Sequence, residues 1–223
     1  MDLIAEDLLL LLLDEHSGRP LVDSTRVTHS LAGALVLELA TMGLLVPEYP
    51  AARQGRSKIT AVGTPPADPL LDLAWRAFAD KPRRAASVLQ KLDSKVKDPL
   101  LERIADKGWV RPERTKVLGM FPRTSWPEVD GRHEAELRNN LGIVLLQGGN
   151  PDPRTGALVS LLLAAQALPK LFPDADKRQL RARAKKLSAG EWAGAAVKQA
   201  ISEVQSAVMV AVMTPVIVSA GSS

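Results

Sequence analysis

Cysteine is absent from this chain of 223 residues, and aromatic residues make up only 4% of it, with a single tyrosine. The absence of cysteine excludes disulfides, thiolate metal sites and a cysteine nucleophile. With so few aromatic side chains, the core must be built from Leu, Val, Ile and Ala. The scarcity of alternating β-branched residues then favours helices over a sheet sandwich. We therefore expect a mainly α protein.

Targeting and membrane-spanning segments are lacking as well. Six leucines occupy positions 8–13, but as a helix they would rise only about 9 Å, against roughly 30 Å of membrane hydrocarbon. Acidic residues precede them, whereas a signal peptide begins with basic ones. A helix that is apolar on all sides is normally buried. The six leucines therefore predict a helix inside the core.

Signatures of catalysis are absent too. The three histidines, His16, His29 and His133, are far apart in the sequence and have no metal-ligand spacing. The chain contains no HExxH motif, phosphate-binding loop, GxSxG motif or dinucleotide fingerprint. We therefore expect no enzyme activity, no catalytic residue, no metal and no cofactor.

Apolar spacing and the positions of Gly and Pro predict the secondary structure. Helices are expected over 4–13, 28–41, 69–79, 132–147, 157–171, 174–187 and 191–213. β-type runs around polar turns predict short surface hairpins within 44–63 and 114–126. The last helix carries Lys198 and Glu203, so we place it in the core. One domain is expected over 1–218, with a disordered tail over 219–223.

A short internal repeat relates two parts of the chain. Segment 38–48 resembles segment 103–113, and each reads as a helix end, a glycine stop and a short strand. The matching pairs are Ala40/Ala105, Gly43/Gly108, Pro47/Pro112 and Glu48/Glu113. The repeat predicts two helix-plus-hairpin units.

Basic residues are clustered, although the formal net charge is only +4. Segment 81–116 holds eleven Lys or Arg against five acids, and segment 170–186 holds seven against two. Such clusters attract the phosphates of nucleic acids or of lipid headgroups. Both classes of partner remain open on this observation.

The second predicted hairpin combines apolar and basic residues. Arg114, Lys116 and Arg123 flank its apolar side chains, which are those of Val117, Leu118, Met120 and Phe121. This combination is typical of a surface that enters a bilayer interface or is covered by a partner subunit.

A winged-helix-like nucleic-acid-binding protein is the alternative. Helix-then-hairpin units resemble a recognition helix followed by a wing. Helix 30–42 argues against this, because it has no Lys, Arg, Asn or Gln with which to read bases. The unit over 95–121 would be the better candidate.

Four segments, taken in order, resemble the Golgi phosphoprotein 3 family in a form like its actinobacterial members. They are LIAEDLLLLLLDEHSG (3–18), SLAGALVLELATMGLL (30–45), LLERIADKGWV (100–110) and DPRTGALVSLLLAAQAL (152–168). The resemblance implies a single, mainly helical domain around a buried hydrophobic helix, with short surface β-hairpins.

The resemblance also implies a function. Eukaryotic members are peripheral membrane proteins that bind phosphatidylinositol 4-phosphate in a basic pocket and act as adaptors for membrane proteins. The family hairpin, which corresponds to 110–126 here, serves self-association and membrane contact. We expect a cytoplasmic protein at the inner face of the membrane, with anionic phospholipid headgroups as partners and no nucleic acid.

The chain departs from the family at the pocket. Eukaryotic members have a Trp and an Arg where this sequence has Asp23 and Ala32, and two further arginines where it has Ser94 and Lys97. Only Lys97 keeps the charge. Nearby basic residues could substitute, so the predicted headgroup-binding residues are Lys97, Arg26, Lys95, Arg83 and Arg84.

Overall fold

The structure is a computed structural model that describes residues 2–48, 57–117, 121–189 and 195–213. Its helices are α1 (Ile4–Leu11), α2 (Ser24–Thr41), α3 (Pro69–Ala79), α4 (Ala85–Asp106), α5 (Arg132–Leu146), α6 (Pro153–Ala164), α7 (Leu168–Leu171), α8 (Lys177–Leu187) and α9 (Ala195–Met213). Its strands are β1 (Leu45–Pro47), β2 (Lys58–Ala61), β3 (Arg83–Arg84), β4 (Glu113–Val117) and β5 (Phe121–Ser125). The predicted mainly α fold is confirmed.

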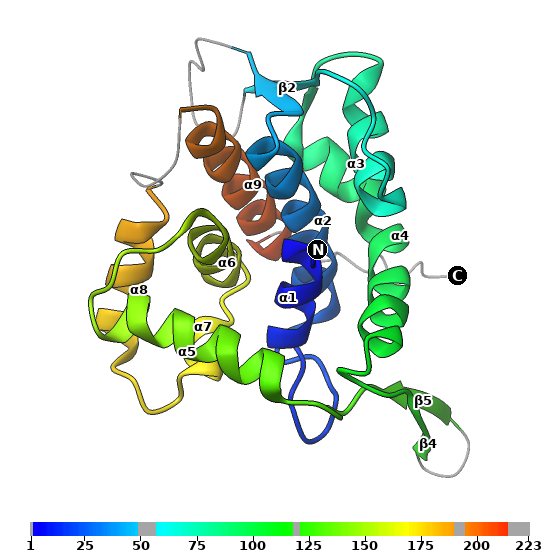
Figure 1. Ribbon diagram of the computed structural model, residues 1–223, viewed down its shortest axis with the longest axis vertical. Helices are drawn as coiled ribbons and strands as arrows, with labels where there is room; N and C mark the ends of the chain where they lie inside the picture. Colours follow the sequence, from blue (N-terminus) through cyan, green and yellow to red (C-terminus); the bar gives the residue numbers. More distant parts are fainter. Residues whose placement is uncertain (1, 49–56, 118–120, 190–194, 214–223) are drawn as a thin grey trace, which may run out of the picture.

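Helix α2 is the centre of the core and packs against α1, α4, α6 and α9 (Figure 1). The residues from Leu31 to Leu37 are all buried, so this helix has no polar face in its middle. All six leucines at positions 8–13 are at most 3% exposed. Because a fully buried leucine stabilises a fold by about 1.5–3 kcal/mol, this run is a main source of core stability. The prediction that the run lies inside the core is confirmed.

Aspartate caps explain several helix starts that differ from the prediction. Helix α2 begins at Ser24, about one turn before the expected residue 28, because the Asp23 carboxylate accepts a hydrogen bond from the Arg26 N–H. Asp176 caps α8 in the same way, so α8 begins at Lys177 rather than at 174. Helix α3 matches its predicted bounds, with Asp68 as its cap.

The single helix predicted over 157–171 is wrong. Helix α6 begins earlier, at Pro153, and ends at Ala164, and the short helix α7 follows. The break is at Gln166, whose φ is 59°. Its N–H donates to the Leu163 carbonyl, and the next N–H donates to the Leu162 carbonyl. This closure normally uses Gly or Asn, so the sequence pattern did not indicate it.

Two small antiparallel sheets lie at the surface. The first has the order β1-β2-β3, and the second consists of β4 and β5. Both predicted hairpins are confirmed, whereas the two-residue strand β3 was not predicted. The β4–β5 hairpin extends away from the helices, beyond the end of α4 (Figure 1).

The two repeat segments have the same local structure. Helix α2 is followed by Gly43 (φ 72°) and helix α4 by Gly108 (φ 75°). In each case the next residue donates its N–H back into the helix, from Leu44 to the Leu39 carbonyl and from Trp109 to the Ile104 carbonyl. Left-handed φ values favour glycine, which accounts for its occurrence at both positions.

Candidate functional site

The five predicted headgroup-binding residues lie on three elements. Arg26 is on α2, Arg83 and Arg84 form β3, and Lys95 and Lys97 are on α4. Since β3 leads directly into α4, the helix from Arg84 to Lys97 is about 20 Å long at a rise of about 1.5 Å per residue. The residues are therefore spread along α4 and its leading strand rather than gathered at one point.

Arg84, Lys91 and Lys95 form one exposed row, which we call the α4 cation row. Lys91 and Lys95 are four residues apart and so lie on the same face of α4, and Arg84 is the residue that precedes its first turn. All three are exposed. Within the residues that the structure describes, none of their side chains has an ion pair or a hydrogen bond. Their charges are therefore available to a ligand.

Lys58 adds a fourth cation that sequence reasoning missed. It is exposed and lies directly opposite Arg84 in the β2–β3 ladder. Like charges opposite each other in a sheet are destabilising. The pairing could not be foreseen, because β3 has only two residues and no strand pattern.

Arg26 and Lys97 each lie about one helical turn from a contact between α2 and α4. His29 Nδ1 is 3.2 Å from Asp93 Oδ1 and joins the two helices. Arg26 precedes His29 by about one turn, and Lys97 follows Asp93 by about one turn. Both side chains are half-buried. Lys97 faces away from Lys95, since two residues rotate a helix by about 200°, so it belongs to a different face from the α4 cation row.

The four family pocket positions have mixed surroundings. Asp23 caps α2 and forms an ion pair with Arg26 Nε at 2.9 Å. Ala32 is completely buried, whereas Ser94 is exposed on α4. Of these four, Lys97 alone supplies a cation, and the charge of the neighbouring Arg26 is partly neutralised by Asp23.

The last turns of α4 use their cations inside the fold. Glu6 of α1 is fully buried, and its carboxylate accepts hydrogen bonds from Arg103 Nε and Lys107 Nζ, both at 2.7 Å. Arg103 Nη1 also donates to Asp68 at 2.6 Å. Lys107 also donates to Asp2 at 2.7 Å, and this hydrogen bond lowers the pKa of Asp2. Two charged donors compensate the cost of burying Glu6.

Asp7 is a second buried carboxylate with its own partners. His133 Nε2 lies 2.8 Å from one carboxylate oxygen, and Arg154 Nε donates to the other at 2.7 Å. The Trp109 ring stacks on His133 with 4.1 Å between ring centroids. Lys107 Nζ lies 4.6 Å from the Trp109 centroid. Because these partners lie far from Asp7 in the sequence, no local pattern could have predicted the contacts.

The base of the β4–β5 hairpin is anchored to the loop after α1. The N–H of Trp126 donates to the Gly18 carbonyl at 3.0 Å. Gly18 has a φ of 61°, and a Cβ there would lie 2.1 Å from the backbone of Trp126 and Pro127. At the far end, Val117 and Phe121 form the last strand pair. Leu118 and Met120 lie outside the described residues.

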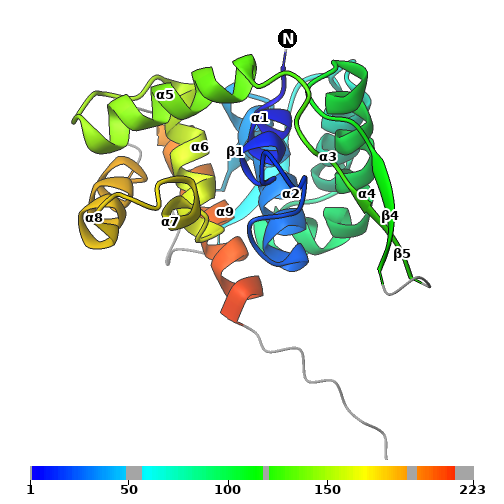
Figure 2. The same ribbon diagram turned by 90° about the horizontal axis from the view of Figure 1, so that it is seen from below.

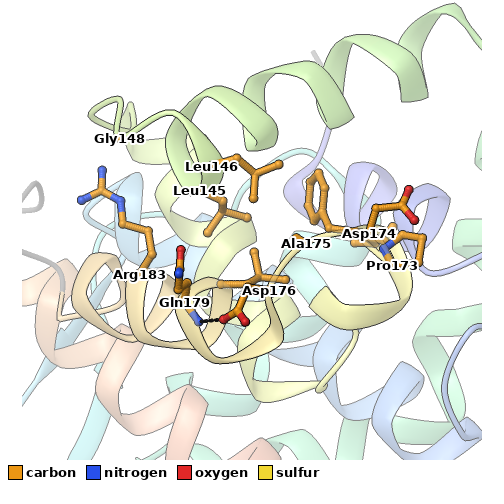
Figure 3. A pocket seen from close by; sticks show the side chains of 12 residues that line it. Leu145, Leu146, Gly148, Pro173, Asp174, Ala175, Asp176, Gln179 and Arg183 are labelled. Carbon is orange, nitrogen blue, oxygen red and sulfur yellow. Dashed lines mark hydrogen bonds between the residues drawn. The ribbon is translucent and has the colours of Figure 1, made fainter.

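A pocket of about 570 Å³ lies between α5, α7 and α8, and side chains that cap α5 and α8 are part of its lining (Figure 3). Arg183 donates to the carbonyls of Val144 and Gly149, at 3.0 and 2.6 Å, and so caps the end of α5. Asp176 accepts from the Gln179 N–H at 2.7 Å, drawn as the dashed line in Figure 3. Because Arg183, the cation of the lining, is already paired, we do not assign this pocket to an anionic ligand.

The fold and the candidate site together define a mainly helical domain with a buried central helix and an exposed basic surface. Among the helices of the described ranges, none has both the length and the apolar character that crossing a membrane requires. The model of the family Golgi phosphoprotein 3 (GPP34) matches residues 4–204, and the chain belongs to this family. No curated protein matches the sequence. GPP34 is not known as a family of enzymes.

Proposed function

We propose that this protein is a peripheral membrane protein that binds anionic phospholipid headgroups through the exposed cations of β2, β3 and α4. The α4 cation row carries this proposal. Its side chains have no partner within the described part of the chain, whereas Arg103 and Lys107 on the same helix are fully paired. Each exposed Lys or Arg near an anionic membrane contributes about 1 kcal/mol. With Lys58, the row would contribute roughly 4 kcal/mol of reversible binding.

The position of Lys58 opposite Arg84 supports the same function. This arrangement lowers the stability of the sheet unless an anion lies between the two cations or near them. A phosphate would remove the repulsion and gain two charge-assisted hydrogen bonds.

The narrower form of the proposal concerns the lipid species. A phosphoinositide-like headgroup, with phosphatidylinositol 4-phosphate as the family example, would be held by Lys97 and Arg26, and the other three predicted residues, Lys95, Arg83 and Arg84, would attract the surrounding bilayer. Lys97 and Arg26 would supply the specific contacts, because they are half-buried beside the contact of His29 with Asp93. Lys95 and Arg84 would supply the general attraction.

The hairpin has two proposed roles. Val117, Leu118, Met120 and Phe121 would enter the bilayer interface or contact a second copy of the chain, and the bound protein would act as an adaptor for membrane proteins. The proposed location is cytoplasmic, at the inner face of the membrane, because anionic lipids give that leaflet its negative surface potential.

Vesicle flotation with paired variants tests the surface. We expect Lys91→Gln with Lys95→Gln to lose most of its recovery with anionic vesicles. The matched control removes two exposed lysines from the other side of the molecule, by Lys170→Gln with Lys177→Gln, and should keep its recovery. Equal losses in both pairs would mean that total charge, rather than the α4 surface, drives binding.

The lipid species needs a separate comparison. Lys97→Glu should lower recovery with vesicles containing phosphatidylinositol 4-phosphate more than with phosphatidylserine vesicles of equal charge. An equal decrease with both lipids would contradict specific binding of phosphoinositides and would leave only the proposal of general binding to anionic phospholipids.

A further inference from the structure

A second pocket lies on the opposite side of the molecule from α4, between the end of α6, the segment around α7, and helices α8 and α9. Both views place α8 and α4 on opposite sides (Figures 1 and 2). The pocket has a volume of about 490 Å³, which is ordinary for a small-molecule site. Its lining residues are Leu162, Leu163, Gln166, Leu168, Pro169, Arg181, Lys185, Gln205 and Met209.

The lining divides into an apolar part and a cationic edge. Leu163 and Pro169 are half-buried and Met209 is 44% exposed, so these three side chains give the pocket an accessible apolar part. Arg181 and Lys185 are both exposed on α8. They are four residues apart, which places their Cβ atoms about 5–6 Å from each other. Neither side chain is paired with any residue of the described ranges.

Two glutamines in the lining point to a polar ligand atom. Gln205 Nε2 is buried and has no hydrogen-bond partner among the described residues, an arrangement that is costly unless another group accepts its hydrogen bond. Gln166 is the only described residue other than glycine with a positive φ. Glycine would adopt this conformation without steric cost, so the Gln166 side chain is held in the pocket lining at the expense of backbone strain.

We propose that this pocket binds a single-chain amphiphile with a phosphate headgroup. The two cations on successive turns of α8 match the charge of a phosphate monoester, which is about −1.5 to −2 at neutral pH. The hydrocarbon chain lies against Leu163, Pro169 and Met209. The amides of Gln166 and Gln205 donate to the headgroup oxygens. This site is independent of the proposed membrane surface on α4.

Calorimetric titration with decyl phosphate below its micelle concentration tests the proposal without any vesicle. We expect Arg181→Gln with Lys185→Gln to weaken binding at least tenfold. The control, Arg178→Gln with Lys186→Gln, removes one Arg and one Lys that are exposed on the same helix but do not line the pocket. It should change the affinity by less than twofold. Equal weakening in both pairs, or no binding to the natural sequence, would overturn the proposal.

Ligands with a shorter chain or without the charged headgroup test the apolar part and the cationic part of the site separately. Octyl phosphate should bind about tenfold more weakly than decyl phosphate, because each buried methylene contributes about 0.8 kcal/mol. Inorganic phosphate and 1-decanol should each bind far more weakly than decyl phosphate. An affinity that does not depend on chain length would exclude the apolar part of the site, and equal binding of 1-decanol would exclude the cationic part. Since no bilayer is present, failure of flotation would leave this result unaffected.

Discussion

In the first half of α4, Lys91 and Lys95 are exposed and have no partner among the described residues, whereas in its last turns Arg103 and Lys107 are held by the buried Glu6. One helix therefore uses the same residue types in two ways. A cation that pairs with a buried carboxylate of the core stabilises the fold. Where no carboxylate is near, the cation contributes charge to the surface. Counting basic residues in the sequence could not separate the two uses.

Removing the paired cations should have the largest effect. Arg103→Met with Lys107→Met leaves Glu6 buried without its charged donors, and the loss in unfolding free energy should be about 3–5 kcal/mol. Chemical denaturation measures it. The control is Arg76→Met, which breaks the exposed ion pair with Asp72 and should leave stability nearly unchanged, because exposed ion pairs contribute little. Similar losses in the two variants would mean that the Glu6 network does not stabilise the fold.

The buried ion pair of Glu134 with Arg138 offers a second test of the paired cations, through the dependence of stability on pH. Burial, together with the neighbouring Glu128, raises the pKa of Glu134 to about 7, despite the ion pair with Arg138. A carboxyl with a raised pKa binds its proton more tightly in the folded state than in the unfolded state. The free energy of unfolding therefore falls as pH rises from about 4.5 to 7. Over this pH range, the free energy of unfolding of the natural protein should fall by up to about 3 kcal/mol relative to that of the Glu134→Gln variant. Parallel stability curves for the two proteins would contradict the assignment.

The end of α6 extends the comparison to backbone strain. Gln166→Gly should raise the unfolding free energy by about 1 kcal/mol, because glycine adopts the left-handed conformation without steric cost. Thermal and chemical unfolding measure this gain. The neighbouring exposed surface provides a control, since Lys170→Gln should leave stability unchanged. A destabilised Gln166→Gly protein would show that the glutamine side chain holds the fold together.

The smallest effect on stability is expected at the α4 cation row. Lys91→Gln with Lys95→Gln should change the unfolding free energy by less than about 0.5 kcal/mol, as surface substitutions usually do. Chemical denaturation in low and high salt checks this. A large loss would indicate that these lysines have a structural role, and the difference between the two parts of α4 would disappear.

Much of the fold could be predicted because its signals are local. The apolar run at 8–13 indicated a buried helix, and Pro69 together with the stretch to Ala79 gave α3 its correct bounds. The break at Gln166 escaped prediction because glutamine carries no sign of a left-handed conformation. The contacts of Glu6 with Arg103 and Lys107 escaped because they join residues about a hundred positions apart.

The candidate site could be predicted only in part for the same reason. Clustered charge in the sequence indicated a basic surface that includes Lys95 and Arg84. Which cations are free depends on distant carboxylates, and Lys58 joins the surface only through its pairing with β3. Whether a given cation is paired or free follows from the three-dimensional arrangement and leaves no local pattern in the sequence.

The central claim is that the exposed cations of α4 and its leading strands bind anionic bilayers. Flotation of the natural protein with neutral and with anionic vesicles, at low and at high salt, tests it most directly. We predict strong recovery with anionic vesicles at low salt, a marked loss as salt rises because exposed charges are screened, and little recovery with neutral vesicles. Equal recovery with neutral and anionic vesicles would contradict the claim.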